Sequence, residues 1–251
     1  MERKIVAIGG GENGRRKSDG TLLPYETEAI DREIVALTGK GRPHFLLLSH
    51  ALPPGAQENY FQVMKAIYGD RLGCLCRDLK SGDLTDSQKV RALMDWADII
   101  YEGGGDTPSL IELWRGTGFD AALRTAWEEG KVLCGLSAGA NCWFEACSTD
   151  TLRIQTGDPE APLTLCRCLG FLPGLFVPHC DEPGRMDSAR SLIKGNSLTG
   201  YCLSNCAALE VVDGRCRLVV SSPNAYGRRL AWREGQLWEE NLDPAGVWQD
   251  L

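Results

Sequence analysis

Short apolar runs alternate with helical patterns through the first half of the sequence. The runs at residues 5–9, 44–49 and 98–101 are each followed by a stretch in which apolar residues recur at helical spacing. The run at 44–49 is almost continuously apolar and is bounded by prolines, which is typical of a strand covered on both faces. Strands that alternate with helices form a parallel sheet with helices on both faces. We therefore expect a doubly wound, mostly parallel α/β fold.

The pattern changes after residue 200. Up to that point we expect strands at 5–9, 44–49, 71–76, 98–101, 131–136 and 175–179, and helices at 25–38, 56–68, 85–97, 107–115, 119–129 and 185–194. Short strands are then expected at 201–203, 207–212 and 215–220, the last two joined by the hairpin signal Asp213-Gly214. They predict a short antiparallel extension near the C-terminus. Because the sequence shows no repeat or linker, residues 1–251 are expected to form a single domain.

Composition and charge exclude several classes of protein. Hydrophobic residues make up 43% of the chain and charged residues 24%, which is the ordinary range for soluble domains. No apolar stretch is long enough to span a membrane. The net charge of -7 argues against a broad nucleic-acid surface, which would need a basic face. The first apolar run is also too short for a signal peptide, so a cytoplasmic location is expected.

Eleven cysteines are present, and none of them forms a C-x-x-C pair. Cys74 and Cys76 are two residues apart, as are Cys166 and Cys168, and on a strand this spacing places both side chains on one face. The spacing does not fit the common zinc frameworks. We expect free, mostly buried thiols in a reducing compartment, with no metal and no cofactor.

A glycine-rich stretch follows the first expected strand. Residues 9–14 match the pattern G-x-G-x-x-G, which binds dinucleotides when a helix begins directly after it. Here no helical pattern resumes before Pro24. A tight loop at the carboxyl edge of the sheet is therefore the preferred interpretation, and a nucleotide-binding module is a third, less favoured function.

A second glycine run, at residues 103–105, lies between an expected strand and an expected helix. Glycines let the backbone turn sharply and aim N–H groups at an anion or a carbonyl oxygen. The alternative is a plain strand-to-helix turn capped by Asp106 or Thr107.

The sequence Gly135-Leu136-Ser137-Ala138-Gly139 is a G-x-S-x-G motif between the strand at 131–136 and a helical stretch at 138–145. This is the context of a nucleophile elbow, in which a sharp turn presents the serine oxygen above the sheet. The turn also leaves the N–H of Ala138 free to bind an oxyanion. A turn that merely needs small residues is the alternative.

A serine nucleophile needs a base, and the chain has three histidines, His44, His50 and His179. His179 ends an expected strand at the carboxyl edge of the sheet, where the elbow also lies and where active-site residues of α/β folds gather. An acid between serine and histidine would match the chain order of α/β hydrolases. The candidates for this acid are Glu145, Asp150, Asp158 and Glu160.

Taken together, residues 99–107, 135–141 and 178–179 resemble the peptidase E (aspartyl dipeptidase) and cyanophycinase family of serine peptidases. The resemblance covers roughly residues 5 to 215. It implies the fold of class I glutamine amidotransferases, which carry cysteine at the elbow. A serine at that position points to hydrolysis of a peptide bond.

The resemblance also implies the catalytic residues. Ser137 would be the nucleophile and His179 the general base, with an oxyanion hole from the N–H groups of Gly105 and Ala138. The peptidase E branch places its acid shortly after the elbow, and Asp150 matches that position.

The cyanophycinase branch instead takes a glutamate downstream of the histidine. Residues 203–206, the corresponding stretch, contain no acid, which favours Asp150. Glu145 is the second choice, because two helical turns would carry it about 12 Å from the elbow.

Two further residues bear on the substrate. Arg185 resembles the arginine that holds the substrate's aspartyl carboxylate in this family, and Asp106 stands where peptidase E has asparagine. A carboxylate at that position would repel an acidic substrate unless Arg185 outweighs it.

The leading hypothesis is a dipeptidase-like serine peptidase that forms an acyl-enzyme on short peptides, with a preference for N-terminal Asp left open. The alternative is a non-catalytic amidotransferase-like domain that binds a small acidic ligand. The oligomeric state is open, a homodimer included.

Overall fold

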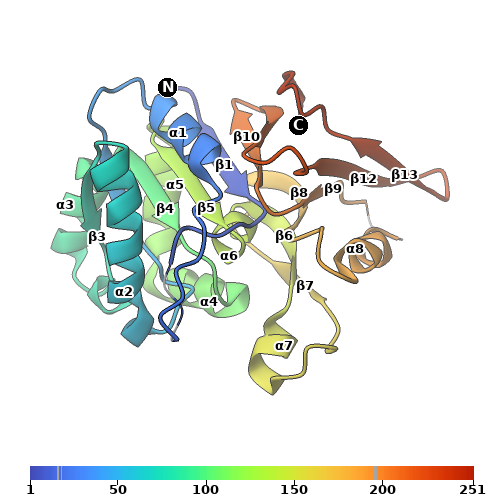
Figure 1. Cartoon of the computed structure of the whole chain (residues 1–251), viewed down its shortest axis with the longest axis horizontal. Helices are drawn as coiled ribbons and strands as arrows, with labels where there is room; N and C mark the ends of the chain where they lie inside the picture. Colours follow the sequence, from blue (N-terminus) through green and yellow to red (C-terminus); the bar gives the residue numbers. More distant parts are fainter. Residues whose placement is uncertain (16, 18, 195–196) are drawn as a thin grey trace.

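Two sheets with helices around them make up the computed structural model, which describes residues 1–15, 17, 19–194 and 197–251 (Figure 1). The first sheet contains β1 (Lys4–Ile8), β2 (His44–Leu47), β3 (Leu75–Asp78), β4 (Ile99–Glu102), β5 (Val132–Leu136), β10 (Ala207–Val212), β11 (Arg215–Val220) and β14 (Gln249–Asp250). Their order is β14-β11-β10-β1-β5-β4-β2-β3. The five strands from β1 to β3 in this order are parallel, whereas β10 pairs with β1 antiparallel. The predicted fold class, with its antiparallel extension, is confirmed.

Helices cover both faces of this sheet. They are α1 (Glu28–Ala36), α2 (Pro54–Lys65), α3 (Ser87–Trp96), α4 (Thr107–Thr117) and α5 (Phe119–Glu128). On β1, Val6 and Ile8 pack with α1 and α2, whereas Ile5 and Ala7 belong to the core that α3, α4 and α5 cover. Successive side chains of a strand point to opposite faces, so one apolar run supplies both cores.

The second sheet lies beside the antiparallel end of the first and was not predicted as a separate sheet (Figure 1). It contains β6 (Phe144–Thr149), β7 (Thr164–Arg167), β8 (Leu172–Val177), β9 (Gly200–Leu203), β12 (Gly227–Arg233) and β13 (Gln236–Asn241), in the order β13-β12-β9-β8-β6-β7. The helices α7 (Thr151–Thr156) and α8 (Arg185–Ile193) accompany it. The central strands β6, β8 and β9 are parallel, so the loops after β8 and β9 leave the same edge.

One predicted helix is much shorter than expected. The helical stretch predicted at 138–145 is the single turn α6 (Ala138–Asn141), and β6 begins at Phe144. Phe144 packs in the core shared with the first sheet, while Ala146 faces the core under α8. This burial on two sides is what a central strand requires. No helix in the described part of the chain combines the length and apolar character needed to cross a bilayer.

Candidate active site

The elbow forms the turn that the sequence predicted. Ser137 stands between β5 and α6 with φ +55° and ψ -112°, a backbone conformation that residues other than glycine rarely adopt. A Cβ at Gly139 would overlap the carbonyl oxygen of Glu102, and one at Gly135 would overlap that of Gly139. The two glycines are therefore needed because the elbow packs backbone directly against backbone.

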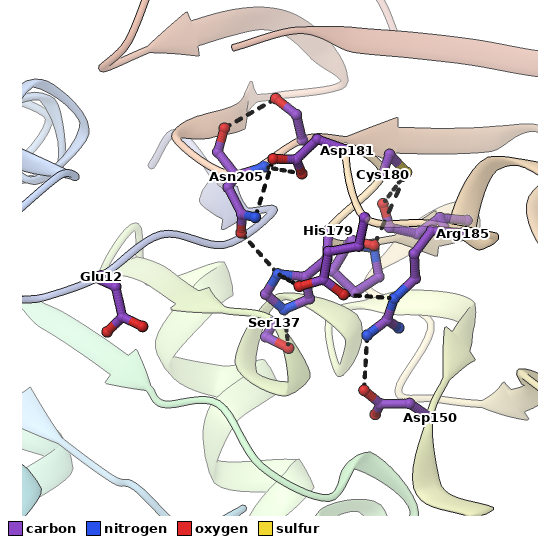
Figure 2. A network of polar contacts seen from close by, with 12 residues as sticks. Glu12, Ser137, Asp150, His179, Cys180, Asp181, Arg185 and Asn205 are labelled. Atoms are coloured by element: carbon purple, nitrogen blue, oxygen red, sulfur yellow. Dashed lines mark hydrogen bonds and ion pairs between the residues drawn. The ribbon is translucent and has the colours of Figure 1, made fainter. Parts of the chain in front are cut away.

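His179 meets Ser137 on the cavity side of the elbow (Figure 2). The His179 Nε2 lies 3.0 Å from the Ser137 Oγ. His179 directly follows Pro178 at the end of β8 and also has a positive φ, +54°. Its backbone N–H donates to the Gly9 carbonyl at 3.0 Å, which ties it to the loop after β1. The geometry allows a hydrogen bond between Ser137 and His179, as a nucleophile and its base would need.

The other ring nitrogen of His179 faces an amide. Its Nδ1 lies 2.8 Å from the Asn205 Oδ1, and the Asn205 Nδ2 donates to the Asp181 Oδ2 at 3.1 Å. The Asn205 backbone N–H donates to the other oxygen of Asp181 at 2.8 Å. A carboxylate only accepts hydrogen bonds, so Asp181 selects the NH₂ side of the amide and leaves its oxygen for His179. The proton of the neutral imidazole then sits on Nδ1, and Nε2 can accept the proton of Ser137.

The glycine run after β1 makes room for this pair. A Cβ at Gly10 would overlap both the Asn205 Oδ1 and the His179 Nδ1. The Gly10 carbonyl accepts from the Cys206 N–H at 2.9 Å. No helix begins here, and the next one, α1, starts at Glu28. The structure thus has the tight loop that we preferred to a dinucleotide site.

The structure does not bring Asp150 to His179. Asp150 follows β6, and its Oδ2 accepts from the Arg185 Nη2 at 2.8 Å (Figure 2). Glu145 is also elsewhere, because its Oε1 accepts from Arg167 at 2.6 Å. Since residues 144–149 form a strand rather than a helix, the turn that follows delivers Asp150 to the start of α8. In the structure the His179 Nδ1 therefore faces Asn205 and not Asp150, the acid that the sequence analysis favoured.

The two predicted substrate residues are likewise engaged elsewhere. The Arg185 side chain is only 5% exposed and is paired with Asp150 and, at 3.2 Å, with Glu182. Asp106 caps α4 by accepting from the Ser109 N–H at 3.1 Å, and its other oxygen accepts from Thr151 at 2.6 Å. Neither Arg185 nor Asp106 is among the residues that line the cavity over Ser137.

That cavity has a volume of about 780 Å³ and holds Ser137 and His179 in its wall. Among the residues that the structure describes, the charged ones that line it are four acids, Glu12, Glu26, Asp181 and Glu182, and one cation, Arg15. Arg15 is itself paired with Glu12 at 2.9 Å. The described lining of the cavity therefore carries an excess of negative charge around Ser137.

Backbone donors stand at the same place. Gly105 lines the cavity and Ala138 follows the nucleophile, and in the described part of the chain neither N–H has a hydrogen-bond acceptor. Glu102 holds the glycine loop, because its Oε1 accepts from the N–H groups of Gly103, at 3.1 Å, and Ala51, at 3.0 Å. Complete burial raises the pKa of Glu102 to about 8, so this carboxyl is mostly protonated at pH 7.

Comparison with known proteins places this chain in a family. The sequence pattern of peptidase family S51 matches residues 18–219. The chain belongs to peptidase family S51. The resemblance to peptidase E is thereby confirmed, and this S51 chain is a serine-type peptidase.

Relatives and solved structures agree. The chain is 34% identical to the uncharacterised peptidase YgaJ of Bacillus subtilis (strain 168), over 94% of this chain and 96% of that one. Its fold is similar to that of a peptidase from an acI-B1 Actinobacterium, with a TM-score of 0.73 at 19% identity over 100% and 98% of the two chains. A candidate peptidase E from Listeria monocytogenes EGD-e gives a TM-score of 0.56 at 15% identity over 97% and 100%.

Sequence reasoning missed three residues of this S51 site, namely Asn205, Asp181 and Gly10. Asp181 lies two residues after the predicted base, which was a usable signal. Asn205 could not be placed, because its contact with His179 depends on β9 lying beside β8 in a sheet that was not predicted. Parallel neighbours bring the loops at their carboxyl ends together, and this adjacency cannot be read from local pattern.

Proposed function

We propose that this S51 peptidase hydrolyses short peptides through a Ser137 nucleophile and a His179 base that Asn205 and Asp181 orient. The observation that carries the proposal is the Ser137–His179 contact of 3.0 Å, with Nδ1 held by Asn205 at 2.8 Å. His179 takes the proton of Ser137 as the oxygen attacks the carbonyl carbon. The oxyanion then accepts from the N–H groups of Gly105 and Ala138.

The rest of the reaction follows from proton return. The imidazolium of His179 gives its proton to the leaving amine, and an acyl-enzyme on Ser137 remains. Water, deprotonated by His179, resolves this intermediate. The neutral Asn205 adds no charge of its own, but Asp181 lies behind it and the Glu182 Oε1 lies 3.7 Å from Nδ1. Both carboxylates favour the imidazolium that forms during the reaction.

The charges of the cavity support a substrate with a positive end. Glu12, Glu26 and Glu182 would attract the free α-amino group of a short peptide, whereas an N-terminal Asp side chain would meet these same carboxylates. Arg185, the predicted partner for such an Asp, is already neutralised by two acids. We therefore propose short peptides with a neutral or basic first residue as the preferred substrates.

The catalytic assignment is tested by labelling and by one substitution. A fluorophosphonate should attach covalently to Ser137 of the wild type and not to Ser137→Ala. Hydrolysis of a mixed dipeptide library by folded Ser137→Ala should fall by about 10⁴–10⁶, as for other triad nucleophiles. Wild-type activity in the alanine variant would overturn the assignment. Absence of both labelling and hydrolysis in the wild type would favour the alternative, a non-catalytic binding domain.

Substrate preference is tested with dipeptides that differ only in their first residue. We expect kcat/KM to be highest for Lys- and Ala-led peptides and lowest for Asp-led ones. Glu26→Gln should lower kcat/KM several-fold for Lys-led peptides and raise it for Asp-led ones, because a cavity carboxylate is removed. Glu128→Gln is the matched control, since Glu128 is exposed on α5 and does not line the cavity. Fastest cleavage of Asp-led peptides would contradict the proposal.

A further inference from the structure

Three thiols come together away from the active site. Cys147 lies on β6, Cys166 on β7 and Cys168 just after β7, and their sulfur atoms all lie within 4.8 Å of one another. The Cys147 and Cys168 sulfurs are 3.6 Å apart. The antiparallel register places Cys147 opposite Cys166, and Cys168, two residues later, falls on the same side. The pairing of β6 with β7 thus adds a third thiol to the Cys166–Cys168 pair.

The surroundings of the three thiols suit a soft metal ion, one that prefers sulfur ligands. Cys147 and Cys168 are buried, whereas Cys166 is half-buried and belongs to the edge strand of the second sheet, which leaves a path from solvent. Arg115 donates to the Cys168 carbonyl at 2.7 Å and brings a positive charge that offsets part of a thiolate cluster's charge.

The number of ligands narrows the choice of metal. A metal–sulfur distance of about 2.3 Å in a trigonal arrangement separates the sulfurs by roughly 4 Å, close to the spacing here. Structural zinc takes four ligands, and the cluster offers three among the residues that the structure describes. Soft thiolates also select Cu(I), which can be held without a fourth ligand.

We propose that Cys147, Cys166 and Cys168 form a trithiolate site that binds one Cu(I) ion. Binding replaces thiol protons with the metal and changes no oxidation state, so up to three protons are released per ion. None of the three cysteines lines the cavity over Ser137, so the site is separate from the hydrolytic machinery. The bound ion would cross-link β7 to β6 and stabilise this edge of the second sheet.

Titration of the reduced protein with Cu(I), without oxygen and against a chromophoric Cu(I) chelator, tests the site. We expect one ion per chain and an X-ray absorption spectrum with a shell of three sulfurs. Cys166→Ser should lose the ion to the chelator. Cys76→Ser should retain it; Cys76 is also half-buried, on the edge strand β3 and two residues from another cysteine, but belongs to no such cluster in the described chain.

Two wild-type measurements keep the test independent of the variants. Cu(I) should protect Cys147, Cys166 and Cys168 from alkylation, as mass spectrometry would show, and the affinity should fall as pH is lowered because protons compete for the thiolates. Equal alkylation with and without Cu(I), or loss of the ion equally in Cys76→Ser and Cys166→Ser, would overturn the proposal. Tighter binding of Zn²⁺ than of Cu(I) in the same titration would overturn the choice of metal.

Discussion

At the residue scale, an amide occupies the place where a serine triad usually holds an acid. Asn205 can support His179 only because Asp181 fixes which way the amide faces. On the proposed mechanism, Asp181 and Asn205 together orient His179, and the Asp181 carboxylate favours the imidazolium that forms there. Removing Asn205 or the charge of Asp181 should therefore lower kcat, through its effect on His179, and leave substrate binding unchanged.

We expect Asn205→Ala to lower kcat by about 10²–10⁴ with little change in KM, because Nδ1 loses its acceptor and the wrong tautomer becomes accessible. Asp181→Asn should have a smaller effect in the same direction. Asp150→Asn is the matched comparison, and it should reduce kcat by less than about tenfold, because Asp150 contacts Arg185 instead. Steady-state kinetics of the three folded variants measure the order. If Asp150→Asn proved the most damaging, Asp150 would have to reach His179 in the working enzyme.

The contact between Ser137 and His179 was predictable, because a local motif marks the serine and a strand end marks the histidine. Asn205 was not, because the reason for its importance is three-dimensional. It was noted in the sequence only as a position without an acid, and that absence directed attention to Asp150. An amide whose orientation is fixed by a hydrogen bond to a neighbouring acid leaves no recognisable pattern in one sequence.

At the element scale, the elbow depends on how closely α6 approaches β4. Gly139 sits where any Cβ would overlap the Glu102 carbonyl, so the helix turn can be seated only with glycine there. Gly116, near the end of α4, is also helical but has nothing within 4 Å of a Cβ. The two positions share a residue type and differ in the space around it.

We expect Gly139→Ala to destabilise the protein by about 3 kcal/mol or more, because backbone must shift to relieve the overlap. Gly116→Ala should instead stabilise it by about 0.5–1 kcal/mol, the usual gain from replacing glycine inside a helix. Urea unfolding of both variants, followed by circular dichroism, measures the difference. Similar small effects in both would mean that α6 can move away from β4 at little cost.

Periodicity predicted most strands of the first sheet, including β10 and β11 at the bounds observed. It missed β14, and the strand expected at 71–76 is β3 at Leu75–Asp78, because the helix before it continues to Arg71. It failed at 138–149, where a single helical turn runs into a buried strand and the apolar residues fit either period. It also failed for β12, in which three arginines hide the apolar positions, Leu230 and Ala231. The hairpin from β12 to β13 turns at Glu234-Gly235, both with positive φ, and Glu-Gly is not among the dipeptides that mark a two-residue hairpin in a sequence.

At the scale of the whole molecule, two buried acids couple folding to pH. Asp31 accepts from Tyr25, Thr27 and Tyr68, yet burial raises its pKa to about 6. Burial raises the pKa of Glu102 to about 8. In the unfolded chain both groups ionise near pH 4, so between pH 4 and these values the folded state binds more protons than the unfolded state. Stability from these groups is therefore greatest at the acid end and is lost as pH rises.

We expect Tm to fall as pH is raised from about 5 to 8. Each group lowers the free energy of unfolding by at most about 1.4 kcal/mol per pH unit over this range. Glu102→Gln should flatten the part of this slope between pH 6 and 8, because the amide stays neutral and its oxygen can still accept from Ala51 and Gly103. Glu128→Gln, on the exposed face of α5, should leave the slope unchanged. Calorimetry across the pH range measures both, and an identical slope in wild type and Glu102→Gln would contradict the prediction.

The pairing of β10 with β1 joins the first strand of the chain to one formed from its last fifth. Asn205 and Cys206 stand directly before β10, and they pack on Gly10, two residues after the end of β1. On the proposed mechanism, a growing chain that has already made Ser137 and His179 still lacks the support for its base. The enzyme would be latent during synthesis, and hydrolysis would begin only when the late strand docks. The rate at which activity returns on refolding would then report the rate at which β10 docks on β1.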